Sequence, residues 1–152
     1  MLIGLIADTH GLLRPEAIAA LSGVSLILHA GDVGGTWILE ELRRIAPVHA
    51  VYGNADMAAP GLEAAVDLDI EGISVHVSHG NEVGTPNPAK LLARYDADVI
   101  VYGHTHRSVI ERNGPRLVVN PGAAGPRRFN IQPSVAKLTI ESGRAGAELI
   151  WL

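Results

Sequence analysis

Short apolar runs alternate with polar segments along the first two thirds of the sequence. Five runs, each four to six residues long and rich in aliphatic side chains, are typical of buried strands, and they lie at residues 2–7, 26–30, 48–52, 73–78 and 99–102. Two segments between the early runs are predicted helices. Pro15 begins one over residues 15–22, and Thr36 caps another over residues 37–45. This alternation predicts parallel strands.

The second half of the chain is richer in predicted strands. Pairs of turn-forming residues separate its apolar segments, at Glu71-Gly72, Asn113-Gly114 and Ser142-Gly143. Asn87-Pro88 begins a further predicted helix that runs to about Tyr95. We expect this half to complete a single domain, residues 1–152, as a second sheet packed on the first.

Composition narrows the classes of protein. The chain is 47% hydrophobic and 18% charged, which argues against disorder, and its net charge of −4 without a dense basic run argues against general nucleic-acid binding. The absence of cysteine excludes disulfides, thiolate metal sites and a cysteine nucleophile. We expect no signal peptide and no membrane span, and therefore a cytoplasmic protein. The apolar C-terminal residues 149–152 suggest a homodimer or larger homo-oligomer.

Side chains that bind metals follow each of the five apolar runs. They are Asp8 and His10, Asp32, Asn54 and Asp56, His79, and finally His104 and His106. A lone histidine after a strand is more often structural, but carboxyl ends of parallel strands share one edge, so the five groups can converge. In an extended backbone, residues two apart point to the same side, which would aim both members of each close pair at one place. Neighbouring glycines leave room for sharp turns.

These motifs, in this order, resemble those of the calcineurin-like metallophosphoesterase superfamily. The short length and Asn120-Pro121-Gly122 resemble its small single-domain bacterial and archaeal phosphodiesterase branch. The resemblance runs from Leu2 to about Gly125 and implies an α/β fold, a four-layer α-β-β-α sandwich of two mixed sheets, with a dinuclear metal centre. The implied ligands are Asp8, His10 and His106 for one metal, Asn54, His79 and His104 for the other, and Asp32 as the bridge. Seven ligands also exceed the six positions usual for one first-row metal.

The resemblance implies a metal-dependent phosphodiesterase or phosphatase. Two divalent ions would activate a hydroxide that attacks small phosphodiesters, with monoesters left open. The mixed donor set favours Mn²⁺, with Fe, Co, Ni or Zn as alternatives, over Ca²⁺ or Mg²⁺. Asn54 and Asp56 are the implied catalytic residues. We expect Asp56 and Asn120 to orient a ligating imidazole by hydrogen bonding, although Asp56 could equally be a turn residue.

Other polar residues are assigned more modest roles. His29 alternates with apolar neighbours and is expected to be a buried structural histidine, while His49 and His76 are expected to be strand residues with ordinary hydrogen bonds. Three arginines in loops could receive a substrate phosphate but are more often solvated: Arg107, Arg127 and Arg128.

Ala55 departs from the family pattern. Many superfamily phosphatases have histidine there, which can protonate the leaving group, and the small phosphodiesterases often have cysteine. Alanine can do neither, so an ordered water or His76 would have to replace it.

Two other functions remain open from the sequence. The same superfamily fold serves as a scaffold subunit of the eukaryotic retromer coat, so a non-catalytic protein-interaction scaffold is the first alternative. A mononuclear zinc hydrolase is the second, but it would leave three or four of the seven ligands unused.

Overall fold

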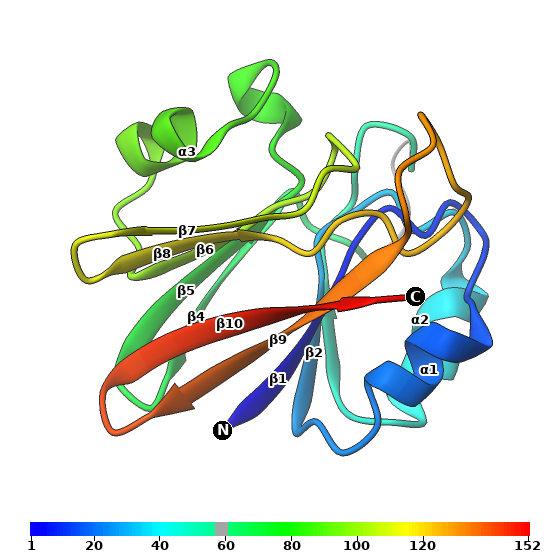
Figure 1. Ribbon diagram of the computed structural model, residues 1–152, viewed down its shortest axis with the longest axis horizontal. Coiled ribbons are helices and arrows are strands. Elements are labelled where there is room, and N and C mark those ends of the chain that lie inside the picture. The colour runs from blue at the N-terminus through cyan, green and yellow to red at the C-terminus, as the bar shows by residue number, and fades with distance from the viewer. Residues whose placement is uncertain (57–60) are drawn as a thin grey trace.

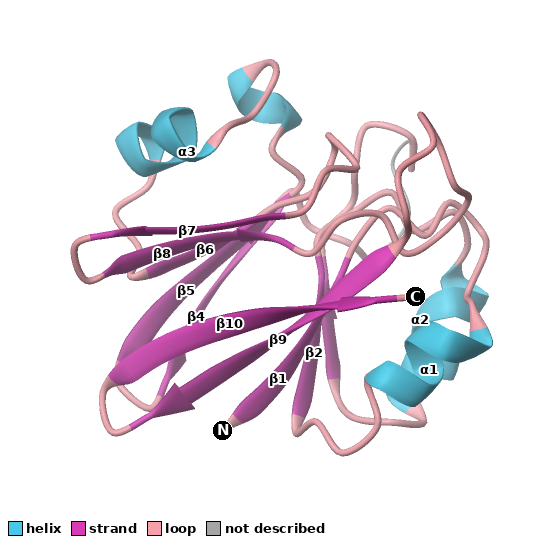
Figure 2. Cartoon of the chain, viewed as in Figure 1, coloured by secondary structure: helices cyan, strands magenta, loops and turns pink. Residues whose placement is uncertain are grey.

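Two five-stranded sheets stack face to face in the computed structural model, which describes residues 1–56 and 61–152 (Figure 1). Helices α1 (Pro15–Ala20) and α2 (Thr36–Arg43) lie outside one sheet, and α3 (Pro88–Arg94) lies outside the other (Figure 2). The predicted four-layer α-β-β-α sandwich of two mixed sheets is confirmed. Each sheet can bury one face against the other because its strands alternate inward and outward side chains.

The first sheet has the strand order β10-β9-β1-β2-β3. Its strands are β1 (Leu2–Ile6), β2 (Leu26–His29), β3 (Val48–Ala50), β9 (Ser134–Glu141) and β10 (Arg144–Trp151). Strands β1, β2 and β3 are parallel, as the alternation of strands and helices predicts. Strands β9 and β10 were expected in the second sheet, and this prediction is wrong. β9 instead pairs antiparallel with β1, which buries Leu138 and Ile140 between the sheets.

The second sheet has the order β4-β5-β6-β8-β7. Its strands are β4 (Ala65–Ile70), β5 (Ile73–Ser78), β6 (Val99–Val101), β7 (Val109–Asn113) and β8 (Arg116–Asn120). The Glu71-Gly72 turn joins β4 to β5 as predicted. The next hairpin is shifted by one residue, because Asn113 pairs with Arg116 and leaves Gly114 and Pro115 as the loop.

The helices begin close to the predicted residues. α1 begins at Pro15, and α3 follows Asn87, whose side chain accepts a hydrogen bond from the Lys90 N–H at 2.9 Å. Thr36 was expected to cap α2 and does not. Gly35 occupies the cap position with extended ψ, so Thr36 is the first helical residue and makes no capping hydrogen bond. A short 3₁₀ turn, η1 (Asn81–Val83), precedes α3.

The apolar C-terminus belongs to the core of this chain. Leu149 packs against the layer between the sheets, and Ile150 and Leu152 pack against the apolar cluster beneath α1 and α2. Trp151 alone of these four is exposed. Packing within this chain therefore explains why these C-terminal residues are apolar. They no longer support the prediction of a homo-oligomer. None of the helices described is long and apolar enough to cross a membrane.

Candidate metal centre

The carboxyl ends of strands from both sheets meet at one edge of the sandwich. Asp8, Asp32 and Asn54 follow β1, β2 and β3 of the first sheet, while His79 and the His104–His106 segment follow β5 and β6 of the second. The sequence suggested convergence at the edge of a mainly parallel sheet. The structure brings the side chains together from two sheets, each of which has a parallel centre.

One group of candidate ligands surrounds Asp8. Its Oδ1 lies 3.8 Å from His10 Nε2 and 3.5 Å from His106 Nε2, and the two imidazole nitrogens are 3.3 Å apart. One ligand atom from each residue can face a single ion. Asp8 is fully buried and its Oδ1 has no hydrogen-bond partner among the described residues. A buried carboxylate oxygen without such a partner is suited to binding a cation.

A second group lies beside the first. His79 Nε2 is 3.2 Å from Asp32 Oδ2 and 3.3 Å from His104 Nδ1, and His104 Nδ1 is 3.0 Å from Asn54 Oδ1. Asp32 Oδ2 is also 3.6 Å from His10 Nε2, so this carboxylate lies between the two groups. Asp8, Asp32 and His79 can also face one ion together. All seven predicted ligands therefore lie in one connected cluster.

The backbone that presents these ligands is not extended, contrary to the sequence-based expectation. Five of the seven have positive φ angles: Asp8, His10, Asp32, His104 and His106, at 53°, 44°, 53°, 73° and 61°. Residues other than glycine rarely adopt this left-handed conformation, and it concentrates at functional sites that the surrounding structure holds in place. Backbone hydrogen bonds hold these loops together, including His10 N–H to the Asp32 carbonyl at 2.9 Å.

Gly53 and its neighbours leave room for Asp32. A Cβ atom at Gly53 would lie 2.5 Å from the Asp32 amide nitrogen and would also overlap its carboxylate. The Ala55 N–H donates to Asp32 Oδ1 at 2.9 Å, which directs Oδ2 toward the histidines. Any larger residue at position 53 would therefore displace the carboxylate that lies between the two ligand groups.

Asp56 and Asn120 were expected to hydrogen-bond a ligating imidazole. Their hydrogen bonds instead go to the loops that carry the candidate ligands. Asp56 accepts hydrogen bonds from the N–H groups of Val33, Gly34 and Gly53. Asn120 donates to the Gly103 carbonyl and to Thr105 Oγ1, and it accepts from the Gly122 N–H. Each residue connects chain segments that carry candidate ligands. For Asp56 this agrees with the alternative that it is a turn residue.

The protonation of the cluster follows from its burial. Burial raises the pKa of Asp8 from 3.8 to about 7. Burial also acts to raise the pKa of Asp32, but the contact with His79 and the Ala55 N–H outweigh it and hold that pKa at about 2. Burial, together with the neighbouring His10, lowers the pKa of His106 to about 4. The imidazoles of His10 and His104 also have lowered pKa values through burial, which favours the neutral form that binds metals.

His79 is oriented by the chain. Its Nδ1 lies 2.8 Å from the Ala30 carbonyl, and because a carbonyl can only accept, Nδ1 carries the hydrogen. In the neutral ring, Nε2 then carries the lone pair that can bind a metal. A backbone carbonyl that fixes the tautomer in this way is typical of histidine metal ligands. Burial acts to lower the pKa of His79, but the contact with Asp32 and the charge of Asp8 outweigh it and raise that pKa.

His29 is structural, as expected. Its Nδ1 accepts from the Gly31 N–H at 3.2 Å, and its Nε2 lies 3.0 Å from Thr9 Oγ1, which donates to the Val33 carbonyl. The side chain is fully buried, and burial lowers its pKa to about 4. The link through Thr9 joins the loops after β1 and β2, and nothing in the sequence singled out Thr9 for it.

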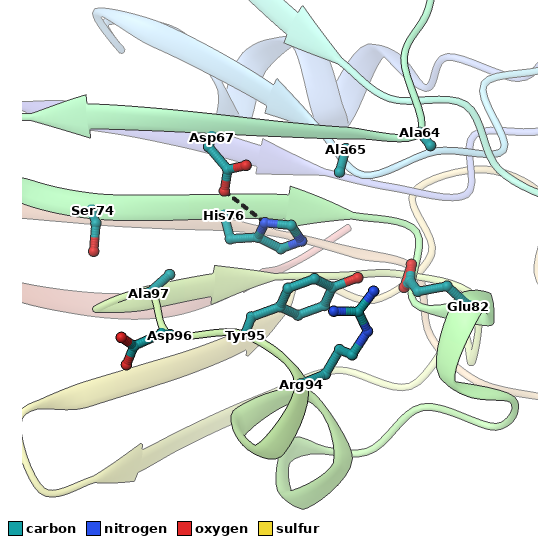
Figure 3. Close-up of a pocket in the computed structure, with 10 residues that line it drawn as sticks. All are labelled: Ala64, Ala65, Asp67, Ser74, His76, Glu82, Arg94, Tyr95, Asp96 and Ala97. Atoms are coloured by element: carbon teal, nitrogen blue, oxygen red, sulfur yellow. Dashed lines mark hydrogen bonds and ion pairs between the residues drawn. The ribbon is translucent and has the colours of Figure 1, made fainter.

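His76 lines a pocket together with Asp67 and Tyr95, and none of the candidate ligands lines that pocket (Figure 3). Its Nδ1 is 2.7 Å from Asp67 Oδ1, and its ring stacks on Tyr95 at the end of α3, with the centroids 3.7 Å apart. The neighbouring Val75 and Val77 face the core between the sheets, so His76 must face outward. It therefore cannot supply the proton that Ala55 lacks.

The arginines differ in how close they lie to the cluster. Arg128 is close enough to influence the pKa values of Asp8, His10 and His106. Arg107 lines a groove beside His104, and Arg127 donates to the Asn130 carbonyl. Arg127 and Arg128 both line a hollow beside His106, so both lie near the cluster.

The comparisons with known proteins agree with this geometry. The model of the calcineurin-like phosphoesterase superfamily domain matches residues 1–143. The chain belongs to this superfamily. A probable metallophosphoesterase of Methanothermobacter thermautotrophicus is 38% identical over 99% of this chain and 92% of its own. A phosphodiesterase of Methanocaldococcus jannaschii is 28% identical over 80% of this chain and 83% of its own.

Solved structures share the fold. Vps29 of Entamoeba histolytica, complexed with Zn²⁺, superimposes with a TM-score of 0.82 at 24% identity over 99% of both chains. An archaeal phosphodiesterase gives a TM-score of 0.76, also at 24% identity, over 99% of this chain and 100% of its own. At this identity the likeness establishes the superfamily fold and not a shared activity.

The buried His29 predicts how the stability of this phosphoesterase domain depends on pH. Its folded pKa of about 4 lies below the ordinary 6.5, so the unfolded chain takes up the proton first as the pH falls. We expect this group to remove about 3 kcal/mol of stability between pH 6.5 and pH 4. His29→Gln should flatten the pH dependence of the unfolding free energy, measured by urea denaturation with chelator present. The exposed His49→Gln serves as the control, and equal slopes for His29→Gln and wild type would contradict the assignment.

The position of Asp32 between the two ligand groups gives a second prediction. Asp32→Asn removes a charge shared by both groups, so we expect metal content and phosphoesterase turnover to fall by about two orders of magnitude or more. Metal content is measured by mass spectrometry after dialysis. Asp96→Asn, an exposed substitution away from the cluster, is the matched control. Full metal content together with full activity in Asp32→Asn would refute the bridging position.

Proposed function

We propose that this chain hydrolyses small phosphodiesters, using water activated by two divalent metal ions. The observation that carries the proposal is the connected cluster of seven metal-binding side chains around the unpartnered, buried Oδ1 of Asp8. Hydrolysis of monoesters is compatible with the same cluster. The substrate is a small phosphoester, and neither a nucleic-acid surface nor a membrane is part of the proposal.

The residues present fit two ions. Asp8, His10 and His106 would hold one ion, Asn54, His79 and His104 the other, and Asp32 would contact both. Mixed imidazole, amide and carboxylate donors suit Mn²⁺, which we favour, and also Fe, Co, Ni or Zn. When bound, two such ions lower the pKa of water and stabilise the charge that develops on phosphoryl oxygens.

The protein contributes orientation and charge. The His104 N–H donates to Asp8 Oδ2 at 3.1 Å, so Oδ1 remains available to the cluster. Asp8 and Asp32 offset only two of the four positive charges of two divalent ions, so the loaded site attracts a phosphate anion, and Arg128 adds to that attraction. Asn54 is exposed, and because its Oδ1 contacts His104, its amide nitrogen can serve as a donor to a phosphoryl oxygen.

A non-catalytic scaffold is the second function to consider, because Vps29 has the same fold. A scaffold acts through its surface and does not require the complete ligand cluster, although the Vps29 structure complexed with Zn²⁺ shows that metal binding alone does not exclude one. The 38% identical relative bears the name of a probable metallophosphoesterase, which supports the enzyme. A mononuclear zinc hydrolase would leave part of the cluster without a role.

Metal content and hydrolysis together distinguish these three functions. Protein purified without chelator should contain about two ions per chain by mass spectrometry, and it should release p-nitrophenolate from bis(p-nitrophenyl) phosphate. Chelation should abolish the activity, and Mn²⁺ should restore it. One ion per chain with full activity would favour the mononuclear enzyme. Failure to bind metal or to hydrolyse any of a panel of diesters, cyclic nucleotides and monoesters would favour the scaffold.

Because position 55 is alanine, we expect the rate of hydrolysis to depend strongly on the leaving group. The methyl side chain cannot donate a proton, and His76 faces away, so esters with poor leaving groups should react slowly. General acid catalysis is typically worth about 10²- to 10⁴-fold. We expect rapid hydrolysis of aryl diesters, slow hydrolysis of alkyl diesters, and a gain of about tenfold or more for alkyl diesters in Ala55→His.

Ala55→Gln controls for the added bulk, since it cannot act as an acid. Aryl and alkyl diesters that react at equal rates in the wild type, with no response to Ala55→His, would show that the proton comes from another group.

A further inference from the structure

Phe129 and Asn130 are strained in a way that the metal centre does not explain. Nine described residues other than glycine have positive φ. Five are candidate metal ligands, and Glu71 and Ser142 lie in two-residue hairpin loops, where this conformation matches the strand twist. The remaining two are Phe129 and Asn130, at 52° and 56°. A bulky side chain in this conformation is rare, and such strain is often associated with ligand binding.

The turn that contains Phe129 holds its ring in solvent. The Ile131 N–H donates to the Arg128 carbonyl at 2.9 Å, which closes a tight turn around Phe129 and Asn130. This turn joins no pair of hydrogen-bonded strands. Asparagine and glycine are the usual residues at such positions, yet here the chain places its one phenylalanine. Phe129 is 78% exposed, more than any other large hydrophobic residue described.

The exposed ring lines one side of a groove of about 510 Å³. The other apolar walls are Pro86, Pro88 at the start of α3, Tyr102 directly after β6, and Val109 at the start of β7. Arg107 adds a guanidinium group at the same groove. An apolar groove with one cation and one exposed aromatic face suits a planar ring that carries polar substituents.

The groove continues into the candidate metal centre. His104 lines the groove, and its Nδ1 lies 3.0 Å from Asn54 Oδ1 and 3.3 Å from His79 Nε2. A phosphoryl group held at the ligand cluster can therefore extend one of its ester substituents along His104 toward Phe129. The occupant of the groove is thus part of the substrate.

We propose that this groove binds a planar aromatic substituent of the phosphodiester, either an aryl group or a nucleobase, with Phe129 as the stacking surface. The proposal rests on the proposed phosphodiesterase function and specifies its substrate class. Stacking on an aromatic side chain is worth about 1–3 kcal/mol per base, which corresponds to roughly five- to 150-fold in affinity.

Binding of matched ligands tests the groove without any need for turnover. Phenylphosphonate and methylphosphonate have the same phosphonate headgroup, and only the first has a ring. We expect the Mn²⁺-loaded wild type to bind phenylphosphonate about tenfold more tightly, measured by isothermal titration calorimetry. A second pair, adenosine 5′-monophosphate and ribose 5-phosphate, asks whether a nucleobase is preferred in the same way. A preference in the first pair alone supports an aryl substituent, and a preference in the second alone supports a nucleobase.

Substitutions at Phe129 locate the preference. Phe129→Ala should bring the affinity ratio within each preferred pair close to one, and Phe129→Leu, which keeps apolar bulk without a ring, should give an intermediate ratio. Trp37→Ala removes a different exposed aromatic residue, on α2 and outside the groove, and should leave the ratios unchanged. Matching thermal unfolding curves would confirm that the variants are folded.

The outcomes separate this proposal from the proposed function. Equal affinities within both pairs for the wild type, a preference that survives Phe129→Ala, or no binding of any ligand at millimolar concentration would each overturn the groove assignment. Release of p-nitrophenolate from bis(p-nitrophenyl) phosphate tests catalysis separately. Activity without the ring preference would reject the groove alone, while a Phe129-dependent preference without activity would reject the esterase and keep the groove.

Discussion

The burial of the Asp8 carboxylate between the ends of two sheets is the constraint on which the site depends. Within residues 1–56 and 61–152 its Oδ1 has no hydrogen-bond partner, although three imidazole Nε2 atoms, from His10, His79 and His106, lie 3.5 to 3.9 Å away. Removing a carboxylate from water costs several kcal/mol unless another charge compensates it. Without metal, that cost appears as a pKa raised to about 7. A divalent cation between Asp8 and the imidazoles would satisfy the carboxylate and the histidine lone pairs together.

The sandwich fold offsets the free-energy cost of the strained ligand loops because it fixes the chain on both sides of each loop. Strands β1, β2 and β6 are buried along their whole length apart from Leu2 and Leu26, so the loops start from positions that cannot shift easily. Each loop then makes a tight left-handed turn, and a residue strained in this way costs about 1–3 kcal/mol. Asp56 accepts hydrogen bonds from neighbouring backbone N–H groups, and Asn120 both donates to and accepts from the backbone, which holds these turns closed. Rigid strands and cross-linked loops together place seven donors at one point.

The sequence predicted those parts of the structure that depend on local pattern. The apolar runs became strands and the Asn87 cap began α3, because both depend on residues close in sequence. The seven candidate ligands were found because they lie within a few residues after five short apolar runs. The sheet that β9 would join could not be predicted, since its pairing with β1 spans more than 130 residues. The left-handed backbone and the outward direction of His76 also depend on packing between distant segments. Phe129 was missed, although a lone phenylalanine in a polar loop is itself a signal.

The energetic cost of the cluster bears on whether this chain catalyses or only binds. Buried carboxylates and imidazoles can often be replaced by well-packed apolar residues without loss of stability, and sometimes with a gain. A scaffold that used only its surface would gain by such replacements at Asp8 and His106, which are both buried. This chain instead keeps both groups, keeps the glycine that makes room for Asp32, and holds His79 in the tautomer that leaves Nε2 available. These features oppose stability and are useful only when cations occupy the cluster, so they support metal binding, which the proposed phosphodiesterase requires and which a purely surface-acting scaffold does not.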